Sequence, residues 1–252
     1  MIDIHSHLIS GINHGPSSME DSLRMLQEAV KAGVRSIIAT PHIKNWTPEE
    51  DKTTRDFKKL SELSLKTGIT LKRGYEVAVS PINDDDERNL RKLTLGGSRY
   101  LLMEFPLNNL PVYTDDVIFK LQLNGICPVI AHPERNSFFT GDPGLLMDLA
   151  DKGCLIQIDA ASIIGRNGRR AKGLCKKLIK MKAVNFVASD AHGGKDYGEC
   201  FKKALDKVKK WAGSEYLDKI VIENPKKIMD DVDFWSGSKD SRKKKIQSRM
   251  AI

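Results

Sequence analysis

The sequence predicts an α/β fold: a distorted, seven-stranded (β/α) barrel of the TIM type. Seven short apolar runs alternate with helical stretches, which is typical of parallel strands covered by helices. Nearly every run is followed by a histidine, aspartate or glutamate, whereas a doubly wound sheet would gather its site at one switch point. A chain of 252 residues is within the range of one barrel domain, which we assign to residues 1–235.

The expected strands are rich in β-branched and apolar residues and stop at polar residues, glycine or proline. They cover residues 2–5, 36–40, 69–75, 100–105, 127–131, 154–158 and 184–189. Ser17 and Glu20 form a capping box that opens a first helix ending at Gly33, and a second runs from Thr47 to Gly68. Further helices are expected at 83–92, 113–124, 143–152, 169–182 and 200–212.

The net charge of +8 is concentrated near the C-terminus, where residues 239–252 carry +5. We assign residues 236–252 to a basic, flexible tail. Such a tail can make weak contact with an anionic membrane surface or can be solvated. Because the body keeps only +3, the charge does not indicate a nucleic-acid-binding protein.

The sequence lacks the signals of membrane insertion and of secretion. No run approaches the ~20 apolar residues that a membrane-spanning helix needs, and no basic segment followed by an apolar run opens the chain. We therefore expect a cytoplasmic protein. Its four cysteines are widely spaced and form no C-x-x-C pair, so reduced, mostly buried thiols are expected rather than disulfides or a zinc knuckle.

Histidines and carboxylates gather after the expected strands. All six histidines lie at strand ends or in the first loop, and none lies in a helix interior. A single histidine is most often a structural residue, but six of them beside three carboxylates favour a shared site. The candidates are His5, His7, His14, His42, Glu76, Glu104, His132, Asp190 and His192.

The spacing of these residues suits metal ions. In His5-x-His7, two imidazoles at positions i and i+2 of a strand point to the same side, and Asp190-x-His192 repeats the pattern. Imidazole and carboxylate together suit manganese, iron or zinc, and nine candidates exceed the three or four ligands that one ion needs. We expect two to three divalent ions and, since such centres activate water and hold phosphoryl oxygens, a hydrolase.

Six short motifs surround these residues. They are MIDIHSH at 1–7, IIATPH at 37–42, GYE at 74–76, MEFP at 103–106, IAHPERN at 130–136 and VASDAH at 187–192. Together they are specific, and they span the chain up to about residue 235. The chain resembles the polymerase and histidinol phosphatase (PHP) superfamily and, within it, the bacterial CpsB/YwqE-type metal-dependent protein-tyrosine phosphatases.

The resemblance implies the PHP fold and a trinuclear centre, usually described with manganese. It implies a protein-tyrosine phosphatase that uses a metal-activated hydroxide and acts on a bacterial tyrosine kinase regulating capsule or exopolysaccharide synthesis. By position, one ion is assigned to His5, His7, Glu76 and Asp190, a second to Glu76, Glu104 and His132, and a third to His42 and His192. Arg135, Glu104 and Asp190 are then the catalytic residues, with Arg135 binding phosphate.

The chain departs from this family at two places. The first loop commonly has a second aspartate that completes the third ion's shell, and here His14 stands there as the expected ligand. A second substrate arginine is common five residues after His192, where this chain has Tyr197. Lys195 can supply the charge for substrate binding but not the planar fork of a guanidinium.

Two other functions stay open at this point. One is a small-molecule phosphomonoesterase of the same superfamily, for example on histidinol phosphate, and the other is a barrel that binds phosphoprotein without turnover. Residues 166–182 carry eight basic side chains and no acid. Such a stretch is most often a solvated helix face, although its start near the rim of the barrel could attract an anionic phosphoprotein.

Overall fold

The computed structural model describes residues 1–12, 14–44, 46–47 and 50–234. The tail predicted for residues 236–252 lies outside this part of the chain. Within the described part, no helix combines the length and the apolar character needed to cross a membrane. All four cysteines are buried free thiols, as the sequence predicts.

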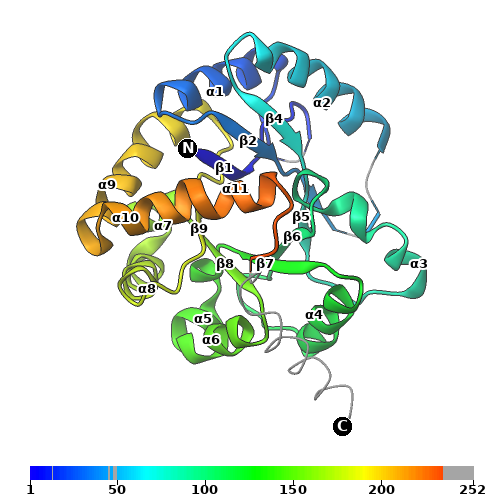
Figure 1. Ribbon diagram of the computed structural model, residues 1–252, viewed down its shortest axis with the longest axis vertical. Coiled ribbons are helices and arrows are strands. Elements are labelled where there is room, and N and C mark those ends of the chain that lie inside the picture. The colour runs from blue at the N-terminus through cyan, green and yellow to red at the C-terminus, as the bar shows by residue number, and fades with distance from the viewer. Residues whose placement is uncertain (13, 45, 48–49, 235–252) are drawn as a thin grey trace.

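The described chain forms nine strands in two parallel sheets, with helices around them (Figure 1). The strands are β1 (Ile2–Ser6), β2 (Ser36–Ala39), β3 (His42–Ile43), β4 (Thr70–Arg73), β5 (Glu76–Ala78), β6 (Tyr100–Glu104), β7 (Cys127–Ala131), β8 (Leu155–Asp159) and β9 (Phe186–Ala188). The order is β1-β2-β4 in one sheet and β3-β5-β6-β7-β8-β9 in the other. The α/β class with parallel strands is confirmed, but a single seven-stranded barrel is not.

Two bends account for the two additional strands. The first lies at Pro41, which has no N–H to donate to a strand ladder, and it separates β2 from β3. The second lies at Gly74, between β4 and β5. A Cβ at Gly74 would be 3.0 Å from the Cα of Leu95, so glycine permits this close approach. Beyond the bends, β3 and β5 pair with each other in the larger sheet.

The two sheets also meet where β1 and β9 end. The backbone N–H of His7 donates to the carbonyl oxygen of Ala191 at 2.9 Å, and that of Asp190 donates to the carbonyl oxygen of His5 at 3.0 Å. Residues at the carboxyl ends of both sheets are thereby held together. We call this end of the strands the rim.

The helices largely follow the expected positions. They are α1 (Met19–Lys31), α2 (Glu50–Leu65), α3 (Asp84–Glu87), α4 (Thr114–Leu123), α5 (Ser137–Gly141), α6 (Pro143–Asp151), α7 (Ala160–Ile164), α8 (Gly168–Lys180), α9 (Lys202–Ala212), α10 (Ser214–Asp218) and α11 (Asn224–Met229). The first helix is capped by Ser18 rather than Ser17, since the Ser18 side chain accepts the N–H of Asp21 at 3.1 Å. The short helices α5, α7, α10 and α11 are not predicted by the sequence pattern.

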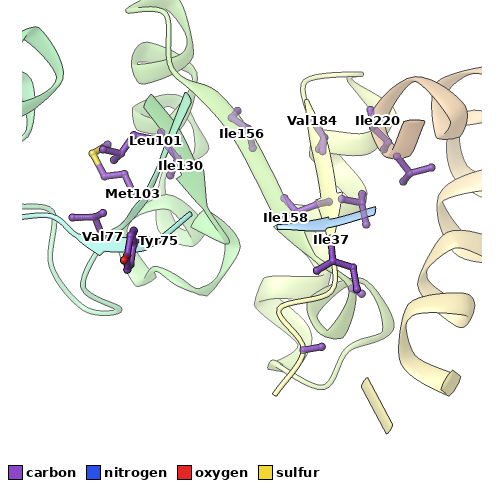
Figure 2. Packing of buried hydrophobic residues seen from close by; sticks show 14 of the residues in the cluster. Ile37, Tyr75, Val77, Leu101, Met103, Ile130, Ile156, Ile158, Val184 and Ile220 are labelled. Carbon is purple, nitrogen blue, oxygen red and sulfur yellow. The ribbon is translucent and has the colours of Figure 1, made fainter. Parts of the chain in front are cut away.

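The strands bury apolar side chains on both faces. On one face of the strands, residues such as Leu101, Met103 and Ile130 belong to the main core (Figure 2). On the opposite face, Leu102 packs in a smaller apolar cluster with Ile228 of α11. In Figure 1, α11 crosses the strands near the centre of the view.

Candidate metal centre

Eight of the nine predicted ligands converge at the rim. They form four overlapping groups of three, in each of which the ligand atoms lie within 4.8 Å of one another. The groups are His7, His42 and His192; His5, His7 and Asp190; His5, Glu76 and His132; and His42, Glu76 and Glu104. All eight lie near the carboxyl end of a strand, directly after it, or just beyond the bend that follows it, so the strand ends position them together.

The carboxylate of Glu76 lies in the middle of this cluster and is fully buried. Its Oε1 is 2.7 Å from Nε2 of His132, and its Oε2 is 2.8 Å from Nδ1 of His42. The same Oε2 is 3.2 Å from Nε2 of His5 and 3.3 Å from Nε2 of His7. One carboxylate thus links imidazoles from three strand ends, as expected for a bridging ligand.

The remaining contacts also fit divalent cations. The Nε2 atoms of His5 and His7 face each other at 3.2 Å. Oδ1 of Asp190 lies 3.3 Å from the first and 3.1 Å from the second. The Nδ1 atom of buried His7 has no hydrogen-bond partner within the described part of the chain. Lone pairs of nitrogen and oxygen that converge in this way suit manganese, iron or zinc.

The charges in the cluster shift one another's pKa values. Burial opposes charge on the imidazoles, but neighbouring carboxylates outweigh it and raise the pKa of His5, and that of His42 and of His132 to about 9. Burial likewise opposes charge on Glu76 and Asp190, yet the surrounding imidazoles hold the pKa of both carboxyls well below the usual range. Without metal the carboxylates are therefore ionised at neutral pH, and a bound cation displaces protons from imidazoles.

The backbone is strained at two of these residues. His132 has φ of 29° and Asp190 has φ of 47°, in the left-handed region that favours glycine. His132 directly follows β7 and Asp190 is the second residue after β9, at the points where the chain turns into the rim. Such conformations cost about 1–3 kcal/mol each and persist where the surrounding structure enforces them.

Tyr197, which stands where a second arginine is common, supports the site through a buried hydrogen bond. It is fully buried, and its hydroxyl donates to Oδ2 of Asp3 at 2.7 Å. Ser189, directly before Asp190, donates to the same oxygen at 2.6 Å. Burial raises the pKa of Asp3 despite these hydrogen bonds. Tyr197 therefore anchors the chain that carries Asp190 instead of facing substrate.

Three polar residues next to the cluster are absent from the predicted set. Oε1 of Gln157 lies 3.0 Å from Nδ1 of His5, and the Gln157 amide donates to Oδ1 of Asp159 at 3.2 Å. The backbone N–H of Asp159 in turn donates to Glu134 at 2.9 Å. Burial, reinforced by the charge of Asp190, raises the pKa of Asp159. The signal for Asp159 was present, since it directly follows the sixth expected strand, 154–158, and so occupies a strand-end position like those of the predicted ligands.

Arg135 lies at the edge of the cluster. Its Nη1 donates to Oδ2 of Asp190 at 2.9 Å and is 3.5 Å from Oδ2 of Asp159. A guanidinium has five N–H donors in all, and these contacts occupy one nitrogen. The side chain is 30% exposed, so its other donors are available to an anion at the rim.

His14 and Lys195 lie outside the cluster. His14 is exposed and belongs to none of the four groups. The backbone N–H of Gly11 donates to the carbonyl oxygen of Pro16 in its loop, and that of Gly15 donates to the carbonyl oxygen of Ile12, and the structure does not bring His14 together with the other predicted ligands. Lys195 is exposed and lines a cleft of about 930 Å³ together with His192, Arg166 and Arg24.

Comparison with known proteins agrees with this geometry. A model of the CpsB/CapC family, described as capsular polysaccharide synthesis, matches residues 1–230. The chain is 35% identical over 233 residues to tyrosine-protein phosphatase YwqE of Bacillus subtilis, covering 91% of each. It is 30% identical over 241 residues to tyrosine-protein phosphatase CpsB of Streptococcus pneumoniae, covering 92% of this chain and 99% of that one.

Solved structures extend the comparison. The described chain superposes with a TM-score of 0.81 on a structure from work on YwqE from Bacillus subtilis and CpsB from Streptococcus pneumoniae, named there as metal-dependent tyrosine phosphatases. That match has 32% identity and covers 93% of this chain and 96% of the other. The lactonase Lmo2620 of Listeria monocytogenes shares the fold alone, at 12% identity and a TM-score of 0.62 over 90% of this chain and 94% of that one. This chain therefore belongs to the CpsB/CapC family of capsular polysaccharide synthesis.

Proposed function

We propose that this protein is a metal-dependent protein-tyrosine phosphatase. The observation that carries the proposal is the convergence of eight histidine and carboxylate side chains at the rim, beside an arginine with free donors. Relatives that align over nine-tenths of the chain bear the name tyrosine-protein phosphatase. A phosphoprotein in capsule synthesis is the expected substrate, with a bacterial tyrosine kinase as the specific candidate and the cytoplasm as the expected location.

The same eight residues are proposed to hold two to three divalent ions. Manganese is the first candidate, with iron or zinc as alternatives. The four groups overlap at His5, His7, His42 and Glu76, so adjacent ions would share ligands. When bound, such ions supply positive charge for phosphoryl oxygens and lower the pKa of a water molecule. His14 is not included, because the structure leaves it exposed.

The residues of the chain have distinct tasks in this proposal. Arg135 binds the phosphate, with Asp190 and Asp159 holding its guanidinium in place through Nη1. Glu76 and Asp190 keep the imidazoles around them oriented, and Glu104, which is 25% exposed, reaches toward the substrate side. Departure of a tyrosine phenolate, with a pKa of about 10, needs less protonation than departure of an alkoxide. Lys195 contributes charge at the cleft.

Turnover with and without metal tests this function. A phosphotyrosine peptide should be hydrolysed by the metal-loaded protein, lose hydrolysis on chelation and regain it best with manganese. Histidinol phosphate should be a poor substrate; the opposite preference would favour the small-molecule phosphomonoesterase. A metal-loaded protein that binds the peptide without releasing phosphate would instead indicate a binding protein.

Arg135 provides a test of phosphate binding that is separate from metal binding. Arg135→Ala should lower turnover by on the order of 10²-fold or more, while Arg135→Lys should recover part of the loss. Elemental analysis should find the metal content of both variants undiminished, because the change removes a cation and no ligand. A fall in metal content that parallels the fall in turnover would refute this role.

A further inference from the structure

Positive charge is concentrated in one segment of the described chain. Residues 160–212 contain 14 lysines and arginines against 4 aspartates and glutamates, a net charge of +10. The whole chain carries +8, so all other residues together sum to −2. The segment contains α7, α8, the strand β9 and α9, and its three helices pack against one another on one side of the molecule (Figure 1).

This segment begins at the rim. β8 ends at Asp159 next to the cluster, and α7 then leads to Arg166. Nη1 of Arg166 is 3.2 Å from Oδ1 of Asp196, whose other oxygen accepts the backbone N–H groups of His192 and Gly193, both at 3.0 Å. Arg166 is thereby held beside the loop that carries a proposed metal ligand, and α8 starts two residues later.

Arg166 pairs with Asp196, but other cations near the cleft have no acidic partner in the described chain. The cleft's own acids Asp21, Glu28 and Glu199 each pair with a cation of the same helix or the helix that follows, namely Arg24, Lys31 and Lys203. By contrast, Arg169 and Arg170 in the first turn of α8 are exposed and form no ion pair with any described residue. Lys195, which lines the cleft, is likewise exposed and forms no ion pair with a described residue.

The chemistry of this surface favours an acidic polypeptide over a lipid bilayer. The apolar residues of α8, such as Leu174 and Leu178, are buried in the core, so the helix offers the interface cations alone. The exposed apolar residue nearby, Met181, follows the far end of α8, away from the rim. An interfacial helix would present apolar side chains to the membrane. The charged start of α8 adjoins the cleft that substrate must reach.

We propose that Arg166, Arg169, Arg170 and Lys195, here named the rim cations, bind acidic residues that flank the phosphotyrosine of the substrate. The proposal rests on the phosphatase function proposed above and extends it to a substrate class: phosphotyrosine within an acidic segment. Exposed charge pairs are individually weak, so several cations act together, and their effect falls as salt rises.

Binding of an unphosphorylated probe tests this surface without reference to turnover. Two fluorescent peptides of equal length are compared by anisotropy on the full chain: one with aspartate and glutamate around a central tyrosine, the other with asparagine and glutamine. At about 0.05 M salt the acidic peptide should bind on the order of tenfold more tightly, and the difference should shrink at about 0.5 M salt.

Two double variants of equal charge locate the effect. Arg169→Gln/Arg170→Gln should weaken binding of the acidic peptide by on the order of fivefold. Lys177→Gln/Lys180→Gln removes two exposed cations of the same helix that lie ~12–16 Å farther from the rim, at 1.5 Å rise per residue, and should change binding less than about twofold. Equal losses in both variants, or no preference for the acidic peptide, would overturn the proposal.

Two further readouts separate the alternatives. Vesicles of phosphatidylglycerol are the first comparison. If the parent protein binds these vesicles but not the acidic peptide, and the Arg169→Gln/Arg170→Gln variant loses vesicle binding, the surface recognises lipid and the peptide assignment is wrong. The peptide probe carries no phosphate, so its binding does not depend on catalysis. A failure of the phosphotyrosine turnover assay would therefore count against the proposed function and not against this binding surface. In the active enzyme, the same variant should raise KM for an acidic phosphopeptide and leave kcat close to that of the parent.

Discussion

The two ends of the parallel strands differ in chemistry although the same strands supply both. Along β6, Tyr100 at the start of the strand lies in the apolar cluster near α11, and Glu104 at its end lies at the rim. Along β8, Leu155 belongs to that cluster and Asp159 ends the strand beside the ligands. One end therefore contributes burial of apolar surface, and the other concentrates charges that burial opposes.

Stability and activity depend on different ends of the strands. At the apolar end, each side chain stabilises the fold by packing alone. At the rim, the side chains need one another, and the carboxylates keep neighbouring imidazoles charged in the absence of metal. A substitution at the rim should therefore lower turnover more than stability, and a substitution at the apolar end should lower stability more than turnover.

The largest effect is expected at Glu76, which contacts four imidazoles. Glu76→Gln keeps the volume of the side chain but removes the negative charge that attracts all four imidazoles. Turnover of a phosphotyrosine peptide should fall by on the order of 10³-fold or more, with a parallel fall in metal content by elemental analysis. Circular dichroism should show an intact fold; activity within tenfold of the parent would remove Glu76 from the centre.

The apolar end should respond in the opposite way. Leu155, the first residue of β8, is buried in the apolar cluster, so Leu155→Ala should lower the free energy of unfolding by about 2–5 kcal/mol in urea titrations. Turnover per folded molecule should stay close to that of the parent, because the change lies away from the rim. A large loss of turnover in molecules that remain folded would show that the two ends are not separable.

The metal-free protein should lose stability as pH rises from about 6.5 to about 9. His42 and His132 have folded pKa values raised to about 9, above the unfolded value of about 6.5. Their contribution is complete below the unfolded pKa and is lost as pH passes through the folded one. The raised pKa of Asp159 acts in the same direction.

Thermal unfolding with a chelator, across this pH range, measures the effect. The Tm of the metal-free protein should decline, whereas the metal-loaded protein should be less sensitive, since coordination already requires deprotonated imidazoles. A metal-free Tm that is flat or rises through this window would contradict the charge balance described for the rim.

The smallest effect is expected at His14. Because its side chain is exposed and outside the ligand groups, His14→Ala should shift the manganese concentration for half-maximal activity by less than about twofold. His14→Asp is the matched comparison, since it would introduce the carboxylate common in the family. A large increase in the manganese requirement of His14→Ala would show that the loop closes over the metals in solution.

Much of the rim was predictable because parallel strands bring their carboxyl ends together. Ligands on six different strand ends could be placed in one site from their position after apolar runs alone. The same logic applied to the sixth strand would have included Asp159, which ends β8.

Other features depend on contacts between distant segments, which a linear pattern does not contain. The division of the sheet at Gly74 follows from the approach of Leu95, 21 residues further along the chain. His14 is exposed in a short loop that is closed by its own backbone hydrogen bonds. The helices α5 and α7 have five residues each, too few to display a 3.6-residue period.

The positive φ angles of His132 and Asp190 create a trade-off between stability and activity. Glycine at either position would relax the backbone, and it would also delete a side chain on which the proposed centre depends. A library of this protein selected for heat resistance alone should therefore accumulate glycine or asparagine at these two sites. A library selected for turnover should keep both residues and gain its stability at the apolar end.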